Sequence, residues 1–395
     1  MKKRLSNLLF AIAVLAVAMV FSASNMVNRQ HEPERTMVND GDDDLFIINV
    51  KGLYGFIDRS GKVVVEPKYC SVRLPFSEGL MPVMDEMEKW GYIDMKGRMV
   101  IKPQFDFARH FRDGLALVSD YKTGKSGFID KHGKVVIKLQ YDNAWDFSEG
   151  MAAVMIGDEE TGKWGFVDKH GKVVIKLQYD YASDFSEGLA AVKTGGKEEG
   201  SWGFIDKRGK MVIAPTYSIV GRFENGLAFA IRGQKVGYID TKGKEVFGFG
   251  DYVLDEFSEG MAVAITTDGD RNLYGFVDTS GKMVIAPQYD FAWDFHEGLA
   301  AVEVDGFIGF IDKSGKMVVK PKHLRAGNFH DGLAVVENKK GKRGYIDKKG
   351  KVVIKQKYDW AEDFNNGLAL VKQGPDEARK MAYIDKQGKY VWREK

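Results

Sequence analysis

Short apolar segments separated by polar turns repeat along most of this chain. In one stretch, residues 164–168 are aromatic and β-branched, residues 173–175 are apolar at three successive positions, and residues 189–192 are apolar with small side chains. Runs of this length and composition, bounded by turn residues, predict β-strands. The continuous apolar run 173–175 is typical of a strand buried between layers. The predicted fold class is therefore all-β.

A fixed polar motif joins the first two of these segments. Its pattern is Asp-x-x-Gly-Lys, as in Asp168 to Lys172, and its Asp and Gly recur in ten copies. Aspartate at the first position of a turn accepts backbone hydrogen bonds, and glycine at the fourth adopts a left-handed conformation easily. The motif predicts a hairpin with a type I turn and a bulge. A calcium ladder is the alternative, but calcium needs about six to eight oxygens around one point, and each unit would supply one carboxylate.

The chain repeats one unit ten times. The tetrapeptide Gly-(Phe/Tyr)-(Ile/Val)-Asp marks nine units, and alanine replaces its glycine in the tenth. These anchor residues are Gly55, Gly91, Gly127, Gly165, Gly203, Gly237, Gly275, Gly309, Gly344 and Ala382. A second motif, Phe-x-x-Gly-(Leu/Met), occurs nine times. A period of this size indicates stacked units of one supersecondary structure rather than separate domains.

The order of segments predicts the topology. Each unit of about 36 residues reads as strand, variable tip, strand, Asp-x-x-Gly turn and strand, which is a three-stranded antiparallel meander. Three is odd, so segments such as 141–150 must cross back over the unit and bury Tyr141 and Phe147. No strand is left over to clasp the first unit to the last. We therefore expect an open, curved or superhelical solenoid, with a closed propeller-like ring as the alternative.

The first 44 residues follow a different pattern. Lys2, Lys3 and Arg4 precede the apolar run 8–21, and the small residues 22–24 follow it. This is the pattern of a secretion signal over residues 1–24. Residues 25–44 read as a polar linker, and 45–395 as the repeat array. The apolar run is shorter than the roughly 20 residues of a membrane span, which favours cleavage and export to the periplasm, cell surface or medium. The alternative is a protein anchored by an uncleaved N-terminal segment.

Composition narrows the classes of protein further. The chain has 58 basic and 56 acidic residues, a net charge of +2 and one cysteine. This even charge does not suggest nucleic acid as a partner, and one cysteine excludes a disulfide framework. The membrane is expected as a partner only through an uncleaved N-terminal segment. The high glycine count of 45 follows from the repeated turns.

Two stretches show a family resemblance. Residues 164–172 read Trp-Gly-Phe-Val-Asp-Lys-His-Gly-Lys, residues 202–210 read Trp-Gly-Phe-Ile-Asp-Lys-Arg-Gly-Lys, and the companion segment 185–192 accompanies them. They resemble the WG (KWG) repeats of bacterial proteins, over roughly residues 45–395. The chain departs from that pattern in its tryptophan, which precedes the anchor only at Trp90, Trp164 and Trp202. The resemblance implies an interaction scaffold and supplies no mechanism.

No residue pattern indicates chemistry. A catalytic carboxylate should be singular and desolvated, whereas the candidate aspartates and glutamates recur with the unit. The seven histidines show neither metal-ligand spacing nor a triad arrangement. We therefore predict no catalytic residue, no cofactor and no metal site. The protein is not expected to be an enzyme.

Aromatic residues and loops are the binding candidates. Flat aromatic side chains on a repeat surface can stack sugars or anchor peptides, and the alternative is that they cover the core. The candidate side chains are Trp145, Trp293, Trp360, Trp164, Trp202 and Tyr274. The longer variable tips, residues 155–164, 193–202, 265–274 and 372–381, are a second candidate surface. The predicted function is a non-catalytic exported scaffold that binds protein through its tips and repeat face. The alternative is a cell-envelope glycan-binding module.

Overall fold

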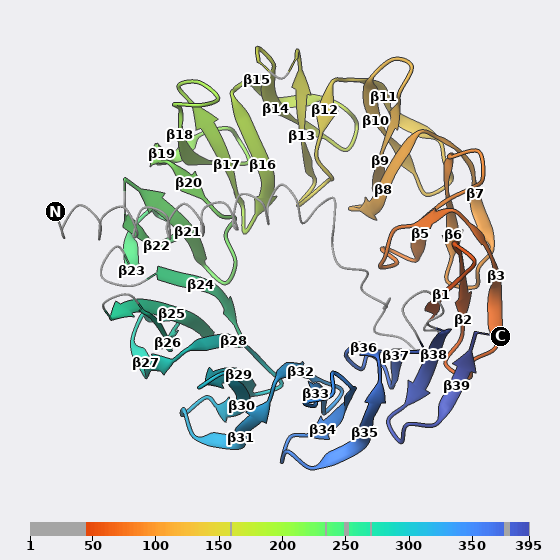
Figure 1. Cartoon of the computed structure of the whole chain (residues 1–395). Helices are drawn as coiled ribbons and strands as arrows, with labels where there is room; N and C mark the ends of the chain where they lie inside the picture. Colours follow the sequence, from red (N-terminus) through yellow and green to blue (C-terminus); the bar gives the residue numbers. More distant parts are fainter. Residues whose placement is uncertain are drawn as a thin grey trace. The chain divides into compact units, whose positions relative to one another are not determined.

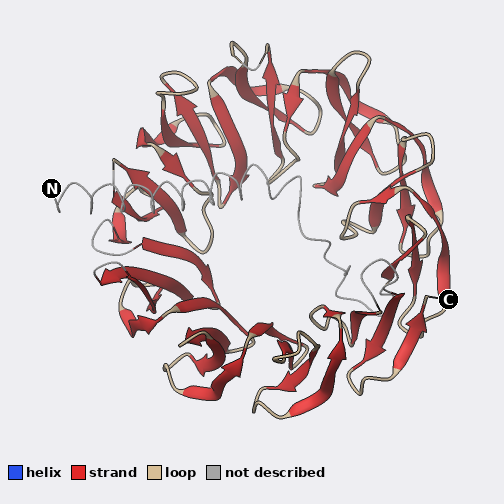
Figure 2. Cartoon of the chain, viewed as in Figure 1, coloured by secondary structure: helices blue, strands red, loops and turns tan. Residues whose placement is uncertain are grey.

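The computed structural model describes residues 45–394 apart from 159, 234, 249–252, 269–270 and 375–379. The described residues form strands, loops and turns and contain no helix (Figure 2). Accordingly, no helix within these ranges is long and apolar enough to cross a bilayer. The predicted secretion signal and polar linker lie outside the described residues.

The strands form small antiparallel sheets in sequence order (Figure 1). Among the described residues, the first sheet, β1-β2-β3, has three strands, and nine others have four. The first strands of the four-stranded sheets are β4 Ser71–Val72, β8 Phe107–Arg112, β12 Asn143–Ala144, β16 Tyr181–Ser186, β20 Ile219–Val220, β24 Val253–Ser258, β28 Phe291–His296, β32 Arg325–His330 and β36 Trp360–Ala361. The second strands, with β1 of the first sheet, are β1 Phe46–Val50, β5 Leu80–Met84, β9 Leu115–Asp120, β13 Met151–Ile156, β17 Leu189–Thr194, β21 Leu227–Arg232, β25 Met261–Asp268, β29 Leu299–Val304, β33 Leu333–Glu337 and β37 Leu368–Gln373.

The remaining strands complete each sheet after the tip. The third strands are β2 Leu53–Ile57, β6 Trp90–Asp94, β10 Lys125–Asp130, β14 Lys163–Asp168, β18 Ser201–Asp206, β22 Lys235–Asp240, β26 Arg271–Asp278, β30 Phe307–Asp312, β34 Arg343–Asp347 and β38 Lys380–Asp385. The fourth strands are β3 Val63–Tyr69, β7 Met99–Phe105, β11 Val135–Tyr141, β15 Val173–Tyr179, β19 Met211–Tyr217, β23 Glu245–Gly248, β27 Met283–Tyr289, β31 Met317–His323, β35 Val352–Tyr358 and β39 Tyr390–Arg393.

The chain divides into two compact units. One is built on Lys68–Gly250 with Gly52–Tyr54. The other is built on Asp251–Lys395 together with Asp40–Lys51 and Gly55–Pro67. The N-terminal strand β1 therefore belongs to the same unit as the C-terminal sheet.

The prediction of three strands per unit was wrong by one strand. The crossing segment does not merely cover its unit, because it forms a strand that opens the next sheet, as β16 does by pairing with β17. A two-residue turn makes this pairing possible: Glu187 and Gly188 have φ angles of 52° and 81°. Two successive positive φ angles are typical of a type I′ hairpin turn, whose twist matches that of paired strands.

The fourth strand is also more exposed than its sequence predicts. Val173 and Val174 of β15 are 45% and 43% exposed, and Ile175 is 3% exposed. The strand pairs on one side only, with β14, so it is an edge strand and not one buried between layers. Three successive apolar residues are compatible with an edge strand and with a strand buried between layers, so the sequence pattern did not distinguish them.

Aromatic residues join neighbouring sheets. Phe185, in the first strand of its sheet, contacts Phe166 of the preceding sheet with 4.9 Å between ring centroids. Both rings are buried. Phe147 makes the equivalent contact with Phe128 at 4.8 Å, and Tyr141 is 3% exposed. The predicted burial of Tyr141 and Phe147 is thus confirmed.

The anchor glycine is required by the approach of the fourth strand. A Cβ on Gly165 would lie 2.5 Å from the carbonyl oxygen of Ile175 and 2.7 Å from the amide nitrogen of Leu177. These are backbone atoms, which cannot move aside without breaking the β14–β15 pairing. The register shift that brings them there lies between the Trp164–Tyr179 and Phe166–Ile175 pairs. The close backbone contact between β14 and β15 therefore explains why the motif has glycine at this position.

The first sheet packs against the last. Within the second unit, Phe46 of β1 contacts Tyr383 of β38 with ring centroids 5.5 Å apart, and the two strands lie near each other in Figure 1. A Cβ on Gly61 would lie 2.2 Å from the carbonyl oxygen of Val391. The ends of an open array would not meet, so the predicted open solenoid was wrong on this point, and the contact fits the propeller-like alternative. Side chains make this contact without a shared strand, which is why counting strands missed it.

Candidate binding face

Three positions of every four-stranded sheet share one face. In the sheet β12–β15, Asn143 is opposite Met155, which is opposite Trp164. Directly opposed residues of antiparallel strands point to the same face, and Trp145, two residues after Asn143, points there too. We call the position of Trp164 the anchor-flanking position, because it precedes the anchor glycine. The positions of Asn143 and Trp145 are called the two first-strand positions.

These positions differ from sheet to sheet, whereas the turn aspartates and core phenylalanines recur. The anchor-flanking residues are Tyr54, Trp90, Ser126, Trp164, Trp202, Val236, Tyr274, Ile308, Arg343 and Met381. The first-strand pairs with described side chains are Ser71 and Arg73, Phe107 and Arg109, Asn143 and Trp145, Tyr181 and Ser183, Ile219 and Gly221, Phe291 and Trp293, Arg325 and Gly327, and Trp360 and Glu362. The sheets of successive repeats therefore differ from one another at these positions.

In the compact unit built on Lys68–Gly250, side chains at these positions form a continuous stack. Two arginines alternate with aromatic rings in its first part. The Arg73 guanidinium lies 4.6 Å from the ring centroid of Trp90 and 4.5 Å from that of Phe107. The Arg109 guanidinium lies 5.8 Å from Phe107 and 5.2 Å from Trp145. A guanidinium within about 6 Å of an aromatic centroid is attracted by the ring quadrupole.

The stack continues through aromatic rings alone. Trp145 is stacked on Trp164 at 5.9 Å and an interplanar angle of 12°. Tyr181 follows, 5.3 Å from Trp164 and 5.4 Å from Trp202. We call the whole set the cation–aromatic ladder; its members are Trp90, Arg73, Phe107, Arg109, Trp145, Trp164, Tyr181 and Trp202. It spans four consecutive sheets.

The structure brings some of the predicted binding residues together and separates others. Trp145, Trp164 and Trp202 are all in the ladder, although Trp164 is only 2% exposed and belongs mainly to the core. In the second unit, Tyr274 and Trp293 both contact Phe291, at 4.7 and 4.6 Å. The remaining candidate is Trp360, also in the second unit; it is 39% exposed and carries the Arg343 guanidinium 4.0 Å from its ring centroid.

Sequence reasoning missed the two arginines of the ladder. Arg73 and Arg109 occupy the same first-strand position as Trp145, and Phe107 occupies that of Trp360. The strand register shows this equivalence, because Ser71, Met84 and Trp90 are opposed as Asn143, Met155 and Trp164 are, whereas counting back from the core phenylalanine shifts Arg73 by one residue. The sequence pattern points to the aromatic members of this position, and an arginine there looks like an ordinary surface residue.

The charges around the arginines are not balanced. Asp146 supplies the one carboxylate that pairs with them among the described residues, 3.7 Å from Arg109 Nη1 and 3.9 Å from Arg112 Nε. Arg73 is in none of the ion pairs there, and its Nε is buried without an acceptor. Burial, and then the neighbouring Arg109, lower the pKa of Arg73. Burial also lowers the pKa of His110, whose Nε2 lies 2.9 Å from the Arg73 carbonyl oxygen.

Carboxylates tie successive variable tips together beside this face. One oxygen of Asp142 accepts a hydrogen bond from Lys125 Nζ at 2.7 Å, at the tip of one sheet. Its other oxygen accepts one from the Gly157 amide at 2.9 Å, at the next tip. The Lys125 hydrogen bond is the main reason that the pKa of Asp142 is lowered. Asp180 joins Lys163 and the Gly196 amide in the same way, so these tips are held in fixed positions.

The recurring glutamates have a structural role between sheets. The Glu149 carboxylate accepts a hydrogen bond from the Gly188 amide at 3.1 Å and pairs with Lys207 Nζ at 3.0 Å. Glu259 makes the same contacts with Gly298 and Lys313. Each glutamate therefore clamps its turn to later sheets. Within the described ranges, no three His, Cys, Asp or Glu side chains converge as metal ligands would.

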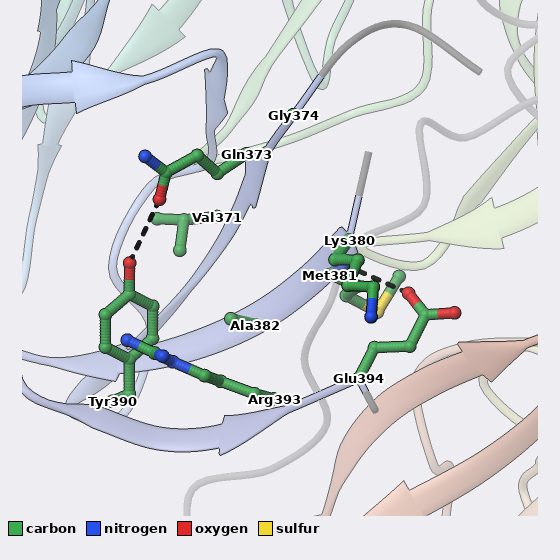
Figure 3. Close-up of a pocket in the computed structure, with 9 residues that line it drawn as sticks. All are labelled: Val371, Gln373, Gly374, Lys380, Met381, Ala382, Tyr390, Arg393 and Glu394. Carbon is green, nitrogen blue, oxygen red and sulfur yellow. Dashed lines mark hydrogen bonds between the residues drawn. The ribbon is translucent and has the colours of Figure 1, made fainter. Parts of the chain in front are cut away.

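A pocket of about 440 Å³ lies in the last sheet (Figure 3). It is lined by Val371, Gln373, Gly374, Lys380, Met381, Ala382, Tyr390, Arg393 and Glu394. In β15 an aromatic residue, Tyr179, is opposite the anchor-flanking Trp164; in the last sheet Glu394 takes a similar place and accepts a hydrogen bond from the Met381 amide at 3.1 Å. Arg393 lies across the Tyr390 ring, 3.3 Å from its centroid. Glu394 and Arg393 thus contact a main-chain amide and a ring of the same sheet, and the pocket reflects the lack of an aromatic side chain opposite Met381.

The fold and this face define an all-β repeat protein with a variable surface. The chain belongs to the family of the WG containing repeat, whose sequence model matches residues 54–86, 90–121, 127–159, 164–197, 202–235, 274–306, 308–342 and 344–374. The family resemblance seen in the sequence is thus confirmed. The matches omit the units anchored at Gly237 and Ala382, whose fourth strands, β23 and β39, are short.

Comparisons with other known proteins give little more. None of the curated proteins matches the sequence. Among solved structures, BamB from Moraxella catarrhalis is 11% identical over 80% of this chain and 93% of its own, with a TM-score of 0.36. AztD from Citrobacter koseri is 12% identical over 89% and 93% of the two chains, with a TM-score of 0.34. Likeness at this level carries no argument about function.

Proposed function

We propose that this protein is a non-catalytic scaffold that binds another protein through the variable face and the tips beside it. One observation carries the proposal: in each sheet the positions at which the repeats differ lie together next to the tip, while those that build the core recur. A repeat protein that presents different side chains on a common framework is suited to recognise an extended partner surface. Aromatic and arginine side chains, which form the ladder, are the residues most enriched in binding hot spots.

The tips contribute rigidity to this surface. Asp142 and Asp180 fix three neighbouring tips through hydrogen bonds to main-chain and lysine nitrogens. A surface that is ordered before binding loses less conformational entropy on association. The tips therefore extend the face formed by the ladder.

The glycan alternative has less support. A sugar stacks on a free aromatic face, whereas Trp145 stacks on Trp164 and contacts Arg109. Trp164 is almost fully buried. Trp360 is more accessible, but the Arg343 guanidinium lies over its ring. The geometry therefore favours a protein partner.

Affinity capture tests the proposal. The full chain with a C-terminal tag is recovered from the cells that make it, beside two variants. One variant combines Trp202→Ala with Tyr274→Ala on the variable face; the matched control is Val174→Thr, on an exposed edge strand. We expect a protein retained by wild type and control and reduced at least tenfold by the face variant. Retention of a polysaccharide in place of a protein, or equal retention by all three, would contradict the proposal.

Export is a separate part of the proposed function. It rests on the N-terminal sequence pattern of residues 1–24, which resembles a cleaved signal. Cell fractionation and N-terminal sequencing check it. We expect the protein outside the cytoplasm with an N-terminus after Ser24, and an intact Met1 in an exported fraction would indicate the anchored alternative.

A further inference from the structure

We propose that Arg73 and Arg109 form a carboxylate-binding site in the cation–aromatic ladder, and that an aspartate or glutamate side chain of the protein partner occupies it. This inference rests on the proposed function and names the chemistry by which the ladder recognises its partner.

The first argument is the charge of the site. Arg73, Arg109 and Arg112 bring three guanidinium groups together, and Asp146 alone among the described side chains pairs with them, at 3.7 and 3.9 Å. These ion pairs involve Arg109 and Arg112, and Arg73 is in none of those between described residues. A desolvated guanidinium without a partner is costly, so a bound carboxylate would stabilise this arrangement.

The second argument is that a buried donor and a buried acceptor lack partners. The Nε atom of Arg73 is buried with no hydrogen-bond acceptor, and Oδ1 of Asp146 is buried with no donor. Buried polar atoms in native proteins are nearly always satisfied. The Arg73 guanidinium therefore lacks an acceptor at this atom within the protein, and an incoming carboxylate would supply the negative charge that balances the group.

The third argument is the way the arginines are held. Aromatic rings support both guanidinium groups, and stacking over a ring leaves the N–H groups at the guanidinium edge directed outward in the plane. A planar fork of donors matches the two oxygens of a carboxylate. Phe107 supports both groups, at 4.5 and 5.8 Å, so they are oriented before a ligand arrives.

Among the sheets whose first-strand side chains are described, this site occurs once. The equivalent first-strand position holds Trp145, Ser183, Gly221, Trp293, Gly327 or Glu362 in the other four-stranded sheets with described side chains there. Two adjacent arginines occur only in the sheets of β4 and β8 among these. A feature absent from the other units is not needed to build a unit, which favours recognition over folding as its role.

The test uses a fluorescently labelled hexaglutamate peptide and the full chain. A hexaglutamine peptide, polygalacturonate and inorganic phosphate are the comparison ligands. We expect hexaglutamate to bind and hexaglutamine not to bind, with polygalacturonate and phosphate competing weakly. Arg73→Gln and Arg109→Gln should each weaken hexaglutamate binding at least tenfold, and the turn variant Arg208→Gln, whose side chain is 85% exposed, should leave it unchanged.

Several results would overturn the inference. They are no hexaglutamate binding, binding unchanged by Arg73→Gln, and tighter binding of phosphate or polygalacturonate. If Arg73→Gln lowers the melting temperature, Arg73→Lys keeps the charge and the aliphatic stem but loses the fork, and should still weaken binding at least threefold. Cellular capture separates the two proposals: a partner retained equally by wild type and Arg73→Gln overturns this site alone, and no captured partner overturns the scaffold function.

Discussion

The hydroxyl group of Tyr383 donates a hydrogen bond to the carbonyl oxygen of Ile47, 2.7 Å away and 336 positions earlier in the chain. Equivalent tyrosines join consecutive sheets elsewhere: Tyr92 donates to the Arg109 carbonyl and Tyr345 to the Glu362 carbonyl, each at 2.7 Å. The last sheet therefore contacts the first as though it were the next in sequence. The N-terminal strand completes the C-terminal end of the fold.

Removing this hydroxyl group should destabilise the protein. Tyr383→Phe leaves the buried Ile47 carbonyl without its donor, which costs about 1–3 kcal/mol in the free energy of unfolding. Urea denaturation followed by circular dichroism measures the change, with Tyr345→Phe as the matched control between consecutive sheets. If Tyr345→Phe destabilises and Tyr383→Phe does not, the first and last sheets do not touch in solution.

A methyl group at the anchor position should disrupt one sheet. The Cβ of Gly165→Ala would meet backbone atoms of β15 at 2.5–2.7 Å, and such overpacking costs about 1–3 kcal/mol. The control is the reverse change in the last sheet, Ala382→Gly, which should cost about 0.5–1 kcal/mol through the added freedom of the unfolded chain. Equal stability of wild type and Gly165→Ala in thermal unfolding would contradict the close approach.

Tryptophans of the variable face should differ in their effect on stability. Trp164 is 2% exposed and belongs to a core cluster, so Trp164→Ala should cost about 3–5 kcal/mol. Trp360 is 39% exposed, and Trp360→Ala should cost about 1 kcal/mol or less, mainly through its contact with Arg343. Chemical denaturation of the two variants tests the difference, and a reversed order would show that burial is misassigned.

Stability should fall in acid because of the hairpin turns. The Asp168 carboxylate accepts hydrogen bonds from the backbone N–H groups of Lys172 and His170 at 3.0 and 2.9 Å, and the Lys172 hydrogen bond is the main cause of its lowered pKa. The folded pKa lies below the unfolded one, so the stabilisation is present above the unfolded value near pH 4 and is lost as the pH falls through the folded value. The same direction holds for Asp58, Asp94, Asp206, Asp278 and Asp312.

The chain offers a matched control for that acid effect. Asn338 already makes the same two backbone hydrogen bonds in its own turn, accepting from Lys340 and Lys342 at 2.8 and 3.1 Å. Asp168→Asn should therefore keep the turn and remove one titrating group. Urea denaturation at pH 7 and pH 3 should show a smaller acid loss for Asp168→Asn than for wild type. An identical loss would exclude this carboxylate as a cause.

The local structure of the unit could be predicted from the sequence because its determinants are local. The Asp168 to Lys172 turn, with Gly171 at φ 78°, has the predicted type I geometry and bulge, with the Gly171 amide 2.9 Å from the Asp168 carbonyl oxygen. The anchor and hairpin strands lie where the motif indicates. These features depend on hydrogen bonds among residues at most four positions apart.

Relations between units could not be predicted in the same way. The pairing of β16 with β17 depends on the left-handed conformation of Glu187, which a glutamate rarely adopts, and the contact of Tyr383 with Ile47 depends on distant parts of the chain. The arginines of the ladder were missed because each looks ordinary alone. Their role depends on the aromatic rings of neighbouring sheets, which only the folded structure brings into contact with them.

The separation of constant core from variable face has an evolutionary consequence. A substitution at Trp145, Ser183 or Gly221 changes what the surface presents, while Phe185 and Asp168 continue to specify the fold. Duplication or loss of one unit would shift the order of presented side chains by one step without creating a new core. Recognition in this protein can therefore diverge at the exposed members of this face while the residues that specify the fold stay unchanged.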